Sequence, residues 1–146
     1  MDVGLSHIAL AVTKIDASIA FYRKYAKMSV VHERIDPVTG IKVVWLSDRT
    51  RPFVLVLIEA DKPDPVLRPF AHLGVGCASK EEVDHLAAMA KKDGVLCKEL
   101  TNSGPPVGYW FFASDPDGHS LELSYGQDVG LAASRSPDSN HKEAGN

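Results

Sequence analysis

The most informative candidate for a catalytic or metal-binding group in this sequence is the carboxylate of Glu122. It lies near the end of the segment S-D-P-D-G-H-S-L-E-L-S-Y, residues 114–125. The D-P-D-G tetrapeptide predicts a tight turn, because proline presets one turn position and glycine supplies backbone freedom at another. Beyond the turn, apolar and polar residues alternate, which predicts a strand with Leu121, Leu123 and Tyr125 on its packed face. Glu122 lies on the other face between two serines, and a carboxylate on an interior strand needs a partner.

Two histidines are candidate partners, because they occupy equivalent positions in an internal repeat. S-H-I-A-L-A-V, which contains His7, matches A-H-L-G-V-G-C, which contains His72, 65 residues later. W-L-S-D in the first copy matches F-A-S-D in the second, and the strands that follow place Val56 on Glu122. Small residues beside each histidine leave room for a bulky ligand. Two pseudo-symmetric modules would therefore bring both histidines, Val56 and Glu122 around one shared axis.

Each copy of the repeat has the pattern βαβββ. The first copy predicts strands at 5–12, 29–35, 41–46 and 53–59, and a helix at 17–26 that Asp16 caps. The second predicts strands at 70–77, 95–100, 109–113 and 120–125, and a helix capped by Ser79 in the capping box S-K-E-E. A proline-rich linker at 61–69 joins modules 1–62 and 68–126 into one domain, 1–126. The polar tail at 127–146 is expected to be disordered or to lie over a partner subunit.

Size and composition narrow the class of protein. A chain of 146 residues with 45% hydrophobic content suits one compact domain. The net charge of -3 is interspersed, so neither nucleic acid nor a membrane surface is an expected partner. Cys77 and Cys97 fit no disulfide or metal motif and are expected to be free thiols. The sequence shows no signal-peptide pattern and no apolar run of membrane-spanning length, which predicts a cytoplasmic protein.

The paired histidines, the βαβββ repeat and the D-P-D-G-H-S-L-E-L ending resemble the vicinal oxygen chelate superfamily. That superfamily includes glyoxalase I, extradiol dioxygenases, methylmalonyl-CoA epimerase, fosfomycin-resistance enzymes and bleomycin-resistance proteins. The resemblance covers residues 4–126. It implies an α+β fold in which two tandem βαβββ modules form an open, barrel-like mixed sheet around a metal cleft, with the helices outside. It also implies a homodimer, and the sequence leaves open whether the modules pair within a chain or across the dimer.

The resemblance implies metal ligands at His7, His72 and Glu122. Two imidazoles and one carboxylate suit a divalent ion, with Fe(II) as first choice and Mn(II), Ni(II) or Zn(II) as alternatives. A small-molecule substrate would chelate the ion through two vicinal oxygens, and Glu122 would serve as both ligand and catalytic group. Glyoxalase I and the epimerases place a fourth, acidic or amide ligand where this sequence has Val56. Glu59 is three residues further along the strand and is expected to face the other way.

The rest of the ligand-bearing face is expected to be apolar. Strand parity and repeat symmetry assign to this substrate cleft the residues Ala9, Trp45, Val56, Trp110 and Phe112. An aromatic stripe is more often part of a core than of a binding surface. If it lines the cleft, it favours a flat or apolar substrate such as a catechol.

These features rank three functions. The three-ligand set favours chemistry like that of the extradiol dioxygenases. The alternative is a glyoxalase-like lyase or isomerase in which Glu122 also moves a proton. A third hypothesis is a non-catalytic, bleomycin-resistance-like protein that binds an apolar ligand. Fosfomycin modification is not expected, because the positions that hold the phosphonate in those enzymes correspond here to Ala9, Phe112 and Leu131.

Overall fold

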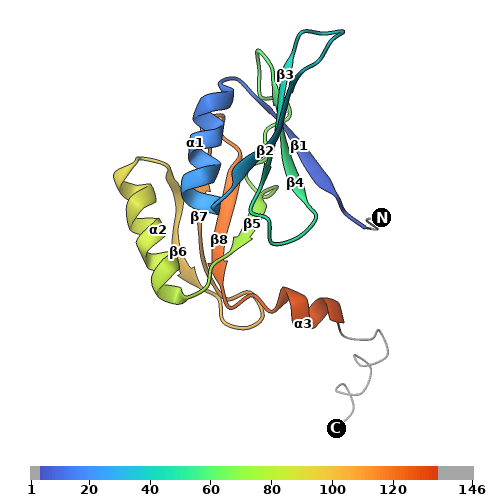
Figure 1. The fold of residues 1–146 in the computed structure, drawn as a ribbon. Helices are drawn as coiled ribbons and strands as arrows, with labels where there is room; N and C mark the ends of the chain where they lie inside the picture. Colours follow the sequence, from blue (N-terminus) through green and yellow to red (C-terminus); the bar gives the residue numbers. More distant parts are fainter. Residues whose placement is uncertain (1–3, 135–146) are drawn as a thin grey trace.

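The computed structural model describes residues 4–134, which form two sheets and three helices (Figure 1). The first module contains β1 (His7–Val12), α1 (Ile15–Ala26), β2 (Ser29–Ile35), β3 (Lys42–Ser47) and β4 (Val54–Glu59). The second contains β5 (Leu73–Gly76), α2 (Lys80–Lys92), β6 (Leu96–Asn102), β7 (Tyr109–Ser114) and β8 (Ser120–Tyr125). A short helix, α3 (Val129–Ser134), begins the tail, and the expectation for 135–146 lies outside the described residues. The predicted α+β fold of two βαβββ modules is confirmed.

The two sheets have the same topology. Their strand orders are β1-β4-β3-β2 and β5-β8-β7-β6, and in each the first strand runs parallel to the last strand of its module. Ala9 pairs with Val56 in the first sheet, as Gly74 pairs with Glu122 in the second. The register therefore places Val56 and Glu122 at equivalent positions, as the repeat predicts. In the part of the chain that the structure describes, the sheets remain open and separate.

Both sheets pack one face against a single apolar core. Helices α1 and α2 lie next to each other on the same side of the molecule (Figure 1), and residues of both modules contribute to the core. Its fully buried members include Val12, Tyr22, Val44, Leu46, Leu55, Leu57, Val83, Phe111, Leu121 and Leu123. Because neighbouring residues of a strand point to opposite faces, Glu122 lies on the face turned away from Leu121 and Leu123. The open face of each sheet is therefore the one that carries the predicted site residues.

The D-P-D-G-H turn between β7 and β8 joins the two modules. The buried Asp115 carboxylate accepts a hydrogen bond from the Tyr22 hydroxyl of α1 at 2.9 Å. Asp117 accepts from the Thr13 hydroxyl at 2.6 Å and from the Thr13 backbone N–H. Burial and the nearby Asp115 charge raise the pKa of Tyr22 far above its ordinary value, so its hydroxyl remains a donor. The turn thus holds α1 and the end of β1 onto the second module.

His119, the last residue of this motif, also connects the modules. Its ring is fully buried, and Nδ1 accepts a hydrogen bond from the Leu67 backbone N–H at 3.0 Å. Nε2 lies 2.9 Å from the Ala11 carbonyl oxygen. Because Nδ1 is an acceptor, the proton of the neutral ring is on Nε2, which donates to Ala11. His119 is therefore a structural residue between the linker, β1 and β8.

The helix starts show one success and one error of the sequence analysis. Ser79 caps α2 as predicted, because its hydroxyl accepts from the Glu82 backbone N–H at 3.1 Å. Helix α1 begins at Ile15 with Lys14 in the N-cap position, so the prediction that Asp16 is the cap is wrong. Asp16 instead lies in the first turn, where a carboxylate interacts favourably with the helix dipole. No helix within residues 4–134 is long and apolar enough to cross a membrane.

Tyr22→Phe should lower the free energy of unfolding by about 1–3 kcal/mol, because it leaves the buried Asp115 carboxylate without one donor. Urea denaturation measures this change. Tyr109→Phe is the matched control, because it removes a hydroxyl that also bonds an aspartate, Asp84, but at an exposed position. Its effect should be under about 0.5 kcal/mol. Equal effects of the two variants would contradict a joining role for Tyr22.

Candidate metal centre and cleft

His72 and Glu122 lie together on the open face of the second sheet. Nε2 of His72 is 3.6 Å from Oε2 of Glu122. Nδ1 of His72 lies 2.7 Å from the Phe70 carbonyl oxygen, to which only a protonated nitrogen can donate. The neutral ring therefore keeps its lone pair on Nε2, the nitrogen that faces Glu122. A hydrogen bond from the second ring nitrogen to a backbone carbonyl is how proteins orient metal-binding histidines.

Glu122 has a second partner that the sequence analysis did not identify. The Gln127 side-chain amide donates to Oε1 of Glu122 at 2.6 Å, and Glu122 is only 8% exposed. One carboxylate oxygen is thus held by Gln127 and the other is turned toward His72. Gln127 lies in the segment expected to be an unstructured tail, and nothing in its local sequence signals that it folds back.

The loop between β6 and β7 holds this segment in place. A Cβ at Gly108, where φ is +85°, would lie 2.4 Å from the Tyr125 carbonyl oxygen and 3.1 Å from the Gln127 nitrogen. Gly126 has a positive φ of +82°, which turns the chain after β8. The loop backbone therefore packs directly on the turn that directs Gln127 toward Glu122.

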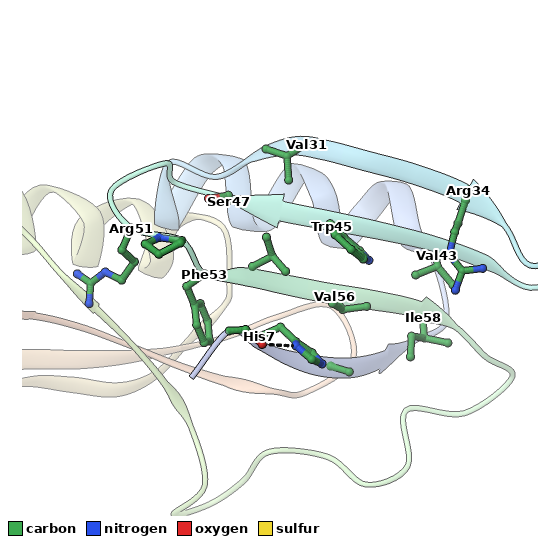
Figure 2. Close-up of a pocket in the computed structure, with 14 residues that line it drawn as sticks. His7, Val31, Arg34, Val43, Trp45, Ser47, Arg51, Phe53, Val56 and Ile58 are labelled. Atoms are coloured by element: carbon green, nitrogen blue, oxygen red, sulfur yellow. Dashed lines mark hydrogen bonds between the residues drawn. The ribbon is translucent and has the colours of Figure 1, made fainter. Parts of the chain in front are cut away.

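His7 lies in a cavity of about 600 Å³ on the open face of the first sheet (Figure 2). Three of the predicted cleft residues, Ala9, Trp45 and Val56, line this cavity with it. Nδ1 of His7 is 2.9 Å from the Ser6 hydroxyl. Trp45 is 39% exposed, so much of its ring is open to a ligand. The alternation of side chains along β1, β3 and β4 therefore correctly predicted that Ala9, Trp45 and Val56 share one face with His7.

His72 borders a cavity of similar size, about 630 Å³, on the second sheet. The two remaining cleft residues, Trp110 and Phe112, line it. The rings of His72 and Phe112 are 4.9 Å apart between centroids, and those of Trp110 and Phe112 are 5.1 Å apart. The exposed Cys97 also opens onto this cavity.

The structure brings two of the three expected ligands together and leaves His7 on the other sheet. Within residues 4–134, no three side chains of His, Cys, Asp or Glu are close enough to share one ion. The sheet face that carries His7 and the face that carries His72 and Glu122 both point away from the common core. The three expected ligands therefore do not meet within one chain.

Residues 4–123 match the model of the Glyoxalase/Bleomycin resistance protein/Dioxygenase superfamily. The chain belongs to this superfamily. It is 34% identical over 140 residues to the uncharacterized protein PA2024 of Pseudomonas aeruginosa, which covers 94% of this chain and 99% of that protein.

Solved structures from the superfamily have the same fold. A possible glyoxalase from Bacillus cereus superposes with a TM-score of 0.62 at 25% identity, covering 84% of this chain and 99% of that one. The fosfomycin resistance protein FosX of Listeria monocytogenes, in complex with Mn(II) and a sulfate ion, has a TM-score of 0.66 at 25% identity. That match covers 86% of this chain and 94% of FosX.

The first sheet has no acid at the position equivalent to Glu122. Val56 occupies the position equivalent to Glu122, and none of the described residues lining the His7 cavity is Asp or Glu. Glu59 lies at the exposed end of β4, paired with Val12 on β1, as the sequence analysis expected. The cavity instead contains Arg34 and Arg51, which the sequence analysis missed. Long basic side chains can reach over neighbouring residues, so strand parity alone does not locate them.

Gly108→Ala should destabilise the protein by about 1–3 kcal/mol more than Gly104→Ala, because only the first adds a clash with the Tyr125–Gln127 turn. Both glycines have positive φ, and a Cβ at Gly104 meets nothing within 4 Å, so Gly104→Ala measures backbone strain alone. Denaturant unfolding of both variants gives the difference. If the two lose the same stability, the loop does not hold the turn.

Proposed function

We propose that this chain is a metal-dependent enzyme of its superfamily, with His7, His72 and Glu122 as ligands of one divalent ion. The His72–Glu122 pair is the observation that supports this proposal most. Its separation of 3.6 Å can be spanned by two ligands that each lie about 2.1 Å from one ion. The tautomer set by Phe70 leaves the required lone pair on Nε2 of His72. Two imidazoles and a carboxylate suit Fe(II), Mn(II), Ni(II) or Zn(II), with Fe(II) as our first choice.

We infer that the site forms between two copies in a homodimer. His7 of one subunit would then join His72 and Glu122 of the other. The shared core supports this arrangement, because it turns the open face of each sheet outward. Both open faces carry partly exposed aromatic side chains around cavities of similar volume, about 600 and 630 Å³. Packing the first-sheet face of one subunit on the second-sheet face of the other would remove this apolar surface from water. Each such pair of faces would enclose one cleft.

The first-choice reaction resembles that of the extradiol dioxygenases, with a small substrate bound through two vicinal oxygens. A divalent ion held by these ligands would stabilise negative charge on the substrate oxygens. Oε2 of Glu122 faces Nε2 of His72, and the hydrogen bond from Gln127 to Oε1 would hold the carboxylate in this orientation. The aromatic rings of Trp45, Trp110 and Phe112 would pack on a flat substrate and exclude water.

Val56 supports this ranking over the glyoxalase-like alternative. Moving a proton between adjacent carbons requires a well-placed base, and the His7 cavity has no carboxylate among its described lining residues. In a lyase or isomerase, Glu122 would have to serve as both ligand and proton carrier. The likeness to a possible glyoxalase from Bacillus cereus keeps this reaction as the alternative. A binding protein without catalysis is the third hypothesis.

Elemental analysis of protein purified without chelator tests the metal site. We expect about one Fe per chain in the wild type, strong loss in His72→Ala, and no loss in His85→Ala, an exposed histidine on α2. Oxygen uptake with catechols should accompany Fe. Bound Ni or Zn without oxygen uptake would instead support the lyase. Failure to bind Fe(II), Mn(II), Ni(II) and Zn(II) would contradict both enzymatic hypotheses and leave the binding protein.

Mixing two inactive variants tests assembly between chains. His7→Ala and His72→Ala should each lose metal and activity alone. Unfolded and refolded together, they form mixed dimers in which one of the two sites has all three ligands. Random mixing should restore roughly a quarter of the wild-type metal content and activity. No recovery, with mixed dimers verified by differently tagged subunits, would contradict a site shared between chains.

A further inference from the structure

The charge of the two cavities is not explained by the metal site. Arg34 and Arg51 line the His7 cavity, and Arg68 and Lys98 line the His72 cavity. None of the described residues that line either cavity is Asp or Glu. The whole chain has 19 acidic and 16 basic residues, so this lining is opposite in sign to the overall balance. A cleft assembled from both faces would be positively charged around its edge.

Arg34 is held in place at one end of the His7 cavity. Its Nη1 donates to Oδ2 of Asp36 at 3.1 Å. The other oxygen of Asp36 accepts from the backbone N–H groups of Val38 and Thr39, at 3.0 and 2.9 Å. Figure 2 shows the Arg34 side chain reaching from β2 toward Val43 on the cavity side of the sheet. A guanidinium has five N–H donors, so this contact orients Arg34 and leaves donors for a ligand.

Arg51 lies toward the other end of the same cavity. In Figure 2, His7 and Trp45 lie between Arg51 and Arg34. The structure shows no side-chain hydrogen bond or ion pair for Arg51 within residues 4–134, and its side chain is exposed. The cavity therefore offers an aromatic surface and a histidine between two cations.

We propose that the substrate is a small organic anion with a flat, apolar body, and that Arg34 binds its anionic group while Trp45 contacts the body. A carboxylate or phosphonate can form two parallel hydrogen bonds with one guanidinium, which fixes its orientation as well as its affinity. Arg51 adds attraction without a fixed geometry. This inference rests on the proposed function, because the same cavity is taken as half of the substrate cleft. It replaces the expectation of a wholly apolar cleft with one that selects for negative charge.

Ligand binding to the full-length protein tests the inference through tryptophan fluorescence, since the chain has two tryptophans, Trp45 and Trp110, and both line these cavities. The probes are phenylacetate, phenylphosphonate, phenylacetamide and acetate. Phenylacetate or phenylphosphonate should bind about 10-fold more tightly than the neutral phenylacetamide, and acetate should bind weakly because it lacks the apolar body. Whichever anion binds more tightly identifies the anionic group. The same titrations of apo and metal-loaded protein separate this contact from binding to the metal.

Arg34→Gln should remove most of the preference for the anion and leave the affinity for phenylacetamide unchanged, which also shows that the variant is folded. Arg34→Lys should retain part of the preference, since it keeps the charge and loses the fork geometry. Arg23→Gln, at an exposed position in the last turn of α1, is the matched control and should behave as the wild type.

Two results would overturn the inference. One is equal affinity of the wild type for phenylacetate, phenylphosphonate and phenylacetamide. The other is a preference for the anion that is as large in Arg34→Gln as in the wild type. Metal content measured on the same samples keeps this test separate from the proposed function. If the protein binds metal but shows no preference for the anionic probes, only the proposed substrate class is refuted. If it prefers the anionic probes but binds no metal, only the proposed metal site is refuted.

Discussion

The common core of the two modules is the constraint on which the site depends. A sheet has two faces, and here each sheet buries one of them against α1, α2 and the other module. Only the opposite faces remain for function, and these carry His7 in one module and His72 with Glu122 in the other. Because the core is shared within the chain, the two faces cannot close on each other without unfolding it. The fold thus places the three proposed ligands on two outward surfaces, and the proposed second copy would bring them together.

One sequence motif links this packing to the site. The D-P-D-G-H turn places Asp115 on Tyr22 and His119 between Leu67 and Ala11, so it fixes the second module to the first. The strand that leaves the turn carries Glu122 three residues after His119. Any movement of the joint would therefore move the carboxylate. The same residues that stabilise the contact between modules also set the position of the proposed ligand, so their structural and functional roles are not separable.

The sequence predicted those features that follow from local periodicity. Alternation along the strands placed Trp45 with Val56 and Phe112 with Glu122, and the observed register agrees. The sequence did not predict features that depend on backbone contacts between distant segments. Gln127 reaches Glu122 because the loop at Gly108 packs on the turn after β8, and no local pattern encodes that approach. The sequence also left open that the proposed ligands lie on two separate faces, because a repeat predicts equivalent positions and not which surfaces meet.

The charge of the proposed cleft and the single carboxylate among the proposed ligands both bear on which reaction the site would favour. A site with several carboxylates would repel an anionic substrate and would provide bases for moving protons. Here Val56 stands where a second acid could have been, and arginines border the same cavity. The absence of a carboxylate at Val56 and the presence of the two arginines both make the local potential more positive. Such a potential favours binding a negatively charged, oxygen-rich molecule and stabilising negative charge on its oxygens, more than it favours abstracting a proton from carbon. This direction agrees with the proposed oxygenase-like reaction of an anionic substrate, in which Glu122 would act first as a ligand.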